Sequence, residues 1–294
     1  MKKFFEFIGL TCLMCFSFFY TEKTVSVVKE LDEIMIKLEE KEKELNTDPI
    51  NAIIKDNTII PGISGKKINI KKSYKRLQKL GTYDESLLIY KKTLPDISIK
   101  NNYDKYIISG NKNNKNISLI FLVDNNDSID NIIKIFKKHK LTPEFFIDGN
   151  WFENNNELVL SLINDGILIN NKGYNNSYQS SSFIWMNTIL KSVKKNNKIF
   201  CLKTNDNDLN KCALEKNYTI SPTIVISNNP YINTEKYIQN GNILAYEINT
   251  TLEKELDLII NKIKQKDINI VPLYKLIEEW YFIFLFFFDI INPR

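Results

Sequence analysis

Ile117-Ser118-Leu119-Ile120-Phe121-Leu122-Val123, followed at once by Asp124, is the stretch that decides the fold of this chain. Its unbroken apolar character is typical of a strand covered on both faces, as in a parallel sheet. Further apolar strands alternate with helix-like segments after it. Such repeated strand–helix units predict an α/β fold with a parallel sheet, and their number favours a distorted (β/α) barrel over an open sheet.

The periodicity places the individual elements of this domain, which we expect over residues 116–279. Helices are expected over residues 129–139, 157–164, 183–194, 209–216 and 252–264. Strands are expected over residues 117–123, 143–147, 167–169, 198–202, 223–226, 242–248 and 268–271.

Residues 1–22 predict a membrane segment. Lys2 and Lys3 precede a run from Phe4 to Tyr20 that is apolar except for Glu6. A cleavable signal peptide is the alternative, but the exit sequence lacks a small-x-small cleavage site. We therefore expect an uncleaved signal anchor in the cell membrane, with the lysines inside and the bulk of the chain extracytoplasmic.

Residues 23–47 predict a helical spacer. Leu31, Leu38 and Leu45 recur every seven residues, with Val28 and Met35 between them. This seam suits a short coiled coil, so a homodimer through residues 24–45 is one hypothesis and a monomeric spacer helix is the other.

Residues 48–115 predict a small N-terminal α/β region with no evident chemistry. A helix is expected from Ile70 to its closing Gly81, and strands over 87–90 and 106–109. The apolar C-terminal tail, residues 280–294, is short and aromatic, and its role is left open.

Composition narrows the possible functions. The net charge is +5, with lysines and acidic residues interspersed, so no nucleic-acid partner is expected. The chain has a single histidine, His139, which is expected to end a surface helix. Cys201 and Cys212 either form a disulfide in an exported domain or remain free thiols, because sequence alone does not give connectivity.

Several ordered segments between residues 117 and 279 resemble the NodB-type polysaccharide deacetylase family. Ser118 to Phe121 with the acidic turn that follows is similar to the family's first strand, which ends in Phe-Asp-Asp-Gly, and residues 143–149 (PEFFIDG) are similar to its ATFFVTG strand. Residues 166–176 (GILINNKGYNN) align without a gap with GHEIGNHGYSH, although several positions differ. The resemblance implies this family's distorted barrel.

The resemblance also implies a divalent metal, a carboxylate base and a histidine acid. If Phe121 is aligned with the phenylalanine of the family's Phe-Asp-Asp-Gly, the two aspartates correspond to Leu122 and Val123. An alignment shifted by one residue instead places Asp124 at the metal-binding aspartate, without a second aspartate beside it. The two metal-binding histidines become Lys172 and Asn176. A lysine ammonium repels a cation. We therefore expect degenerate family positions at Val123, Lys172 and Asn176, with no metal, no cofactor and no catalysis.

Oxygen ligands for Mg²⁺ or Ca²⁺ remain conceivable, although turns rich in Asp and Asn commonly serve local hydrogen bonding alone. They would come from Asp124, Asn125, Asn126, Asp127 and Asp148. Polar and aromatic residues at the predicted strand ends suggest a different site, a groove for cell-wall glycan. Its candidates are Asn150, Trp151, Tyr174, Asn175 and Tyr178.

Three hypotheses follow. The first is a membrane-anchored pseudoenzyme that binds cell-wall glycan. The second is an active, atypical carbohydrate deacetylase or hydrolase that uses Asp124, Asp148 or Glu247. The third is a structural module that dimerises through the spacer helix.

Overall fold

The computed structural model describes residues 9–21, 32–124, 128–175, 177–178, 180–193, 198–204 and 208–279. The chain forms two compact units. Unit 1 consists of Met1–Pro49 and Ser64–Thr93, and unit 2 consists of Ile50–Ile63 and Leu94–Arg294. Of the region predicted over residues 48–115, residues 48–49 and 64–93 belong to unit 1, and residues 50–63 and 94–115 belong to unit 2.

A helix of residues 9–21 lies in the N-terminal apolar run. Among the helices of the described residues, none has the length and apolar character that crossing a bilayer requires.

Unit 1 contains α2 (Glu33–Leu45), β3 (Gly65–Ile68), α3 (Ile70–Leu80), the 3-10 turn η1 (Glu85–Leu87) and β4 (Tyr90–Thr93). The predicted helix up to Gly81 is confirmed, and Gly81 ends α3 with a φ of 79°, which glycine adopts without steric cost. The strand predicted over residues 87–90 is wrong, because η1 occupies its start and the strand begins at Tyr90, pairing antiparallel with β3.

The apolar side of α2 is covered within unit 1. Leu38 is fully buried in a cluster with Ile68, Tyr74, Leu77 and Leu88. The described residues of the seam proposed for a homodimer through residues 24–45 are therefore covered by side chains of the same chain. Leu31 and Val28 lie outside the described residues. The described part of this seam packs against α3 of the same chain, and a homodimer through residues 24–45 stays a prediction.

Unit 2 is built on an 11-stranded sheet in the order β1-β2-β5-β10-β9-β8-β7-β6-β12-β11, with β13 also paired to β6. The strand bounds are β1 (Ile53–Lys55), β2 (Thr58–Ile60), β5 (Tyr106–Ile107), β6 (Asn116–Val123), β7 (Glu144–Ile147), β8 (Leu168–Asn171), β9 (Phe200–Leu202), β10 (Tyr218–Ile220), β11 (Ile224–Ile226), β12 (Ile243–Glu247) and β13 (Asn269–Ile270). All pairs are parallel except β1 with β2.

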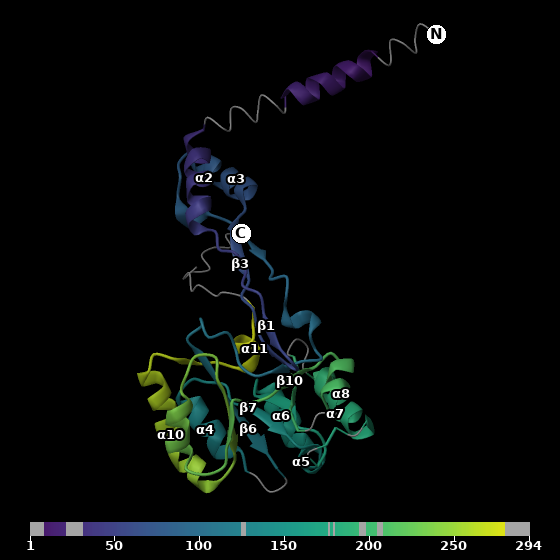
Figure 1. Ribbon diagram of the computed structural model, residues 1–294, viewed down its shortest axis with the longest axis vertical. Coiled ribbons are helices and arrows are strands. Elements are labelled where there is room, and N and C mark those ends of the chain that lie inside the picture. The colour runs from purple at the N-terminus through teal and green to yellow at the C-terminus, as the bar shows by residue number, and fades with distance from the viewer. Residues whose placement is uncertain are drawn as a thin grey trace, which may run out of the picture. The chain divides into compact units, whose positions relative to one another are not determined.

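Helices connect these strands, and Figure 1 shows α4 and α10 together on one side of β6 and β7. Their bounds are η2 (Ile99–Asn101), α4 (Asp130–Lys138), α5 (Gly149–Asn154), α6 (Asn156–Asn164), α7 (Ser180–Val193), α8 (Asp208–Leu214), α9 (Pro230–Tyr237), α10 (Thr250–Gln265) and α11 (Leu273–Leu276). The sequence missed β10, because this strand of three residues follows α8 directly with little flanking signal.

Two apolar cores lie on the two faces of the sheet. Phe121 and Val123 of β6 join the core beneath the helices, whereas Ile120 and Leu122 join a second core that includes Leu273 and other residues near α11. Alternate residues of a strand point to opposite faces. The prediction that this run is buried on both sides is confirmed.

The predicted barrel is corrected to a curled, half-open sheet. Over the described strands the hydrogen bonds form one path that ends at β1 and β11. The physical reason lies at β10, whose free side pairs with β5, and β5 in turn pairs with β2. The N-terminal strands thus occupy the edge that a closing strand would need.

Candidate functional site

Three neighbouring strands end in line at one edge of the sheet. Val123 pairs with Ile147, and Ile147 pairs with Asn171. The next residues, Asp124, Asp148 and Lys172, therefore follow the ends of β6, β7 and β8 at this edge. The carboxyl ends of parallel strands are where α/β proteins place their sites.

Lys172 and Asp124 form an ion pair across this edge. The Lys172 Nζ atom lies 2.5 Å from Asp124 Oδ1, although the residues are 48 positions apart in the sequence. The lysine side chain is 7% exposed and the aspartate side chain 53% exposed. The Lys172 backbone N–H is fixed by a bond to the Ile147 carbonyl at 3.0 Å, which holds the start of the lysine side chain close to the strand ends.

This set of side chains does not fit the metal that the family resemblance implies. Lys172 is a donor with no lone pair for a cation and brings its own positive charge. Val123 is fully buried and apolar. Within the described part of the chain, no three His, Cys, Asp or Glu side chains are grouped so that they could hold a metal. Asn176, like Asn125, Asn126 and Asp127, lies outside the described residues.

Asp148 has a structural role at the start of α5. Its side chain is 2% exposed, and Oδ1 accepts a hydrogen bond from the Asn150 N–H at 2.9 Å. This is the N-cap arrangement, which satisfies a backbone donor that the helix leaves unpaired. One oxygen of this carboxylate is therefore used in capping α5.

Tyr174 packs at the same rim. A Cβ atom built on Gly149 would lie 2.6 Å from the Tyr174 ring, so the tyrosine sits directly on the glycine backbone. Its hydroxyl donates to Glu153 Oε2 at 2.8 Å, and this bond raises the pKa of Tyr174. Asn175 is exposed, with a φ of 50°. Tyr174 and Asn150 are thus half-buried, and Asn175 is exposed.

Two members of the predicted groove are buried and are corrected here. Trp151 is 3% exposed and belongs to the core beneath the helices. Tyr178 is fully buried, and its hydroxyl donates to backbone carbonyls and accepts from the Leu202 N–H at 2.7 Å. Burial also raises the pKa of Tyr178. Neither ring is accessible for stacking on a sugar, because both side chains are buried.

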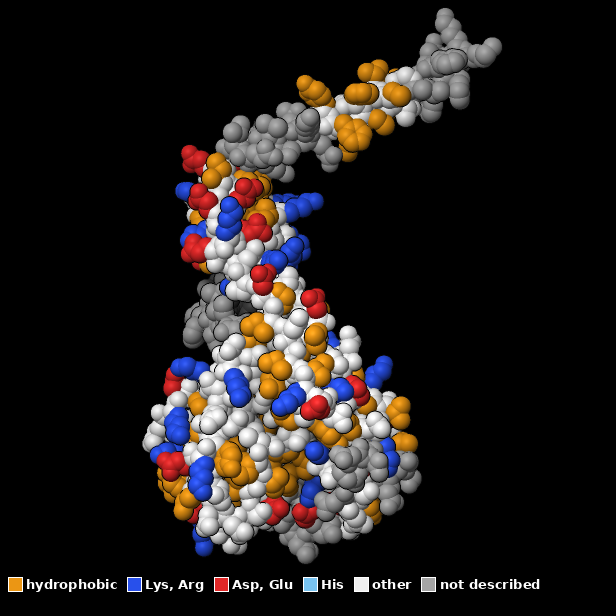
Figure 2. Space-filling view, viewed as in Figure 1, with side chains coloured by type: hydrophobic (Ala, Val, Ile, Leu, Met, Phe, Trp, Pro, Cys, Tyr) orange, Lys and Arg blue, Asp and Glu red, His pale blue; other side chains and the backbone are white. Residues whose placement is uncertain are grey.

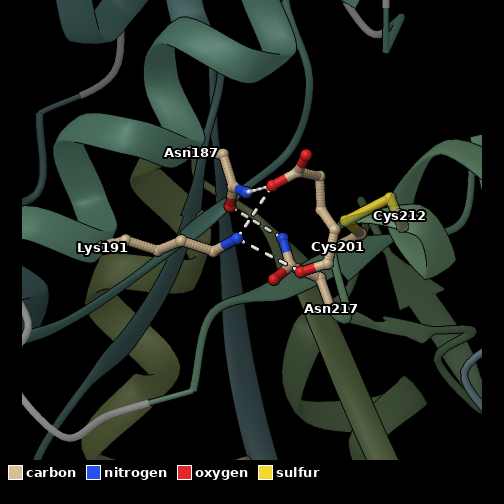
Figure 3. Close-up of polar contacts among 6 residues, drawn as sticks. Asn187, Lys191, Cys201, Cys212 and Asn217 are labelled. Carbon is tan, nitrogen blue, oxygen red and sulfur yellow. Dashed lines mark hydrogen bonds and ion pairs between the residues drawn. A yellow bond between two sulfur atoms is a disulfide. The ribbon is translucent and has the colours of Figure 1, made fainter.

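Cys201 and Cys212 are joined in a disulfide between β9 and α8, with a Cα–Cα distance of 6.5 Å. A polar network lies beside it (Figure 3). Asn217 Nδ2 donates to Asn187 Oδ1 at 2.7 Å, and Asn187 Nδ2 donates to Glu215 Oε2 at 3.1 Å. Lys191 Nζ also donates to Glu215 Oε2, at 2.9 Å. The disulfide and this network fasten α7 and α8 to the sheet.

Glu247 is the exposed last residue of β12 and pairs in register with Leu122. His139 is the C-cap residue of α4, as expected, and its Nε2 lies 2.8 Å from Asp257 Oδ1. Both assignments match the sequence, which placed Glu247 at a strand end and His139 at a helix end.

Sequence reasoning missed a buried carboxylate, Glu144, at the opposite end of β7. It is 2% exposed and accepts from Asn170 Nδ2 and from the Leu273 N–H, both at 2.7 Å. The available signal was a charged residue inside an apolar strand. Its partners explain the burial, because every buried carboxylate requires donors.

Comparison with known proteins identifies the fold. Residues 109–210 match the family model described as polysaccharide deacetylase. The chain is 32% identical over 154 residues to the uncharacterized protein YlxY of Bacillus subtilis (strain 168). That match covers 52% of this chain and 48% of YlxY, so the chain spans about half the length of this relative.

Among solved structures, the fold is similar to wild-type BA3943, a CE4 family pseudoenzyme from Bacillus anthracis. The TM-score is 0.64 at 19% identity, covering 85% of this chain and 96% of that chain. A BA3943 mutant with restored enzymatic activity gives the same TM-score at 18% identity, covering 85% and 99%. The Bc1960 peptidoglycan N-acetylglucosamine deacetylase gives 0.51 at 18% identity, covering 58% and 92%.

The matched span, the order of the strands and the similar solved structures agree. Residues 109–210, within the curled α/β domain of this chain, match the polysaccharide deacetylase family, and the fold of the domain is that of solved CE4 family structures.

Proposed function

We propose that this protein is a catalytically inactive polysaccharide deacetylase homologue that acts outside the cytoplasm as a glycan-binding module. In this proposal the N-terminal apolar run tethers it to the cell membrane. The observation that carries the loss of catalysis is the ion pair between Lys172 and Asp124 at the aligned ends of β6 and β8.

The charge of this pair supports the proposal. In the alignment shifted by one residue, Asp124 takes the place of the family's metal-binding aspartate, and Lys172 takes that of the first histidine of H-x-x-x-H. Histidine binds a metal through a neutral nitrogen, whereas the lysine ammonium already neutralises the aspartate. A divalent cation entering this position would have to displace an ammonium that is almost completely buried.

The position of the catalytic base supports it independently. With Asp124 in the metal-binding aspartate's place, the other aspartate of the family pair corresponds to Val123. Val123 is fully buried and packs in the core beneath the helices. A valine cannot accept a proton from water, so the general-base role has no side chain at this position.

The alternative of an atypical hydrolase is less well supported. Such an enzyme needs carboxylates that are available to accept and donate protons. Asp124 is paired with Lys172, and Asp148 caps α5. Glu247 is exposed and would be left as the remaining member of the predicted acid–base set.

Glycan binding is the finer part of the proposal. Tyr174, Asn175 and Glu247 lie at or just beyond the carboxyl ends of strands, where this fold class places its ligands. The relatives support a carbohydrate ligand, since the Bc1960 protein is described as a peptidoglycan N-acetylglucosamine deacetylase. The membrane tether rests on the sequence of residues 4–20 alone.

The test is a reconstruction of the missing chemistry. We would compare the wild-type chain with the variant Val123→Asp, Lys172→His, Asn176→His. A control variant would carry two histidines at exposed positions by the opposite ends of the strands, Asn113→His, shortly before β6, and Lys266→His, at the C-cap of α10. After incubation with Zn²⁺ or Co²⁺ and desalting, bound metal and deacetylation of N-acetylglucosamine oligomers would be measured.

We expect the wild type and the control to retain no stoichiometric metal and to show no turnover, and the reconstructed variant to retain about one metal ion, as the family's donor set would. Wild-type protein that retains close to one equivalent and loses turnover with a chelator would overturn the proposal. Glycan binding is measured separately, as wild-type protein sedimenting with insoluble peptidoglycan, and its absence would remove that part alone.

A further inference from the structure

Charge is segregated within unit 1. Residues 64–93 carry nine Lys or Arg and two Asp or Glu, a net of +7. The whole chain carries +5, so the remainder carries a net of −2. The helix α2 in the same unit is rich in glutamate instead. A composition bias spread evenly along the chain does not produce such a separation.

The helix α3 gathers five cations on one side. At about 100° per residue, they fall within an arc of about 140°. They are Lys71, Lys72, Lys75, Arg76 and Lys79, here called the α3 basic face. All five are exposed, α3 contains no acidic residue, and the buried side chains Ser73, Tyr74 and Leu77 lie on its opposite side.

These five cations form no ion pair in the described part of the structure. Other lysines of unit 1 do have acidic partners, such as Lys67, which lies 3.4 Å from Asp48. Figure 2 shows the blue side chains gathered on the α3 side of the unit, while red ones concentrate over α2. Like charges held side by side without partners raise the local positive potential, which favours binding of an anion.

The spacing of the cations indicates a linear partner. Along the axis of α3, successive members of the row Lys71, Lys75 and Lys79 are about 6 Å apart. Lys72 and Arg76 form a second row with the same separation. The arc of the five cations contains no apolar side chain, and the exposed Leu80 beside it is one residue, whereas insertion into a bilayer requires an apolar face. No aromatic ring belongs to the α3 basic face either, as stacking of nucleic-acid bases would require.

We propose that the α3 basic face binds a linear phosphodiester polymer without nucleobases, of the polyol-phosphate or sugar-phosphate kind. Successive phosphates of such a chain would lie along the two rows of cations. The inference goes beyond the proposed function and is independent of it, because all of its residues lie in unit 1 and none contributes to the Lys172–Asp124 edge.

The experiment uses the full chain in non-ionic detergent and end-labelled synthetic poly(glycerol phosphate), with binding followed by fluorescence anisotropy. The test variant replaces all five residues of the α3 basic face by Gln. The matched control replaces five exposed lysines of unit 2 by Gln, which changes the net charge equally: Lys112, Lys137, Lys254, Lys266 and Lys275. Far-UV circular dichroism checks that α3 persists, since Gln is a good helix former.

We expect wild-type binding to weaken with salt at a logarithmic slope of about −3.5 for five phosphate contacts, or about 100-fold between 50 and 200 mM salt. The test variant should lose at least tenfold in affinity at low salt, and the control should stay within about twofold of wild type. Equal losses in both variants, or no binding at low salt, would overturn the proposal. So would tighter binding to single-stranded DNA or to anionic lipid vesicles than to the polymer.

Discussion

The ion pair at the ends of β6 and β8 predicts an asymmetric response to mutation. In Asp124→Asn the ammonium of Lys172, whose side chain is 7% exposed, loses its counter-charge. In Lys172→Met the remaining carboxylate of Asp124 is 53% exposed and can be hydrated, while the methionine keeps the apolar stem packed. The first change should therefore cost more free energy of unfolding than the second.

The exposure of the two side chains sets the magnitude. Removing one partner of a fully buried pair costs about 3–5 kcal/mol, whereas an exposed pair contributes less than about 1 kcal/mol. Because one partner is buried and the other half-exposed, we expect about 2 kcal/mol for Asp124→Asn and about 1 kcal/mol or less for Lys172→Met. The double variant should cost less than the sum of the two, with a coupling energy of about 1 kcal/mol.

The assay is urea unfolding of the full chain in detergent, followed by tryptophan fluorescence. The three tryptophans, Trp151, Trp185 and Trp280, all belong to unit 2, so the signal follows the unit that contains the pair. Equal costs for the two single variants, or costs that add in the double variant, would show that the two side chains do not act as a buried charge and its counter-ion.

Two further predictions concern other parts of unit 2. The disulfide of Cys201 and Cys212 closes a loop with a sequence separation of 11, so the double variant to Ala should lose about 3 kcal/mol of unfolding free energy in urea; a loss below about 0.5 kcal/mol would mean that the disulfide does not constrain the unfolded chain. Asp257 has a lowered pKa because Lys138 donates to it, with His139 adding to the effect. A carboxyl with a lowered folded pKa contributes stability above its unfolded pKa of about 4 and loses it as the pH falls through the folded value. In Asp257→Asn the melting temperature should therefore decrease less steeply as the pH falls below about 4. A decrease as steep as in the wild type would contradict this.

Much of the fold could be predicted from local pattern. The run from Ile117 to Val123 is buried on both faces because every residue in it is apolar or small. The end of α3 follows from Gly81, whose left-handed conformation is a local property. That the sheet stays open was not predictable, because it depends on β5 pairing with β10 across more than a hundred residues.

The site was predictable in its residue types and not in its contacts. The sequence indicated that Lys172 and Asp124 occupy family metal positions. Only the folded chain decided that they contact one another, and that Trp151 and Tyr178 are buried and not part of an open groove.

The sequence by itself determined which residue types are available, because it contains one histidine and aligns Lys172 and Asn176 with the family's two metal-binding histidines. The tertiary structure decided what these residues contact. It aligned the ends of β6 and β8 so that an ammonium lies beside the aspartate. The physical reason is that residue types are local, whereas strand register, burial and the pairing of charges are set by contacts between segments far apart in the chain.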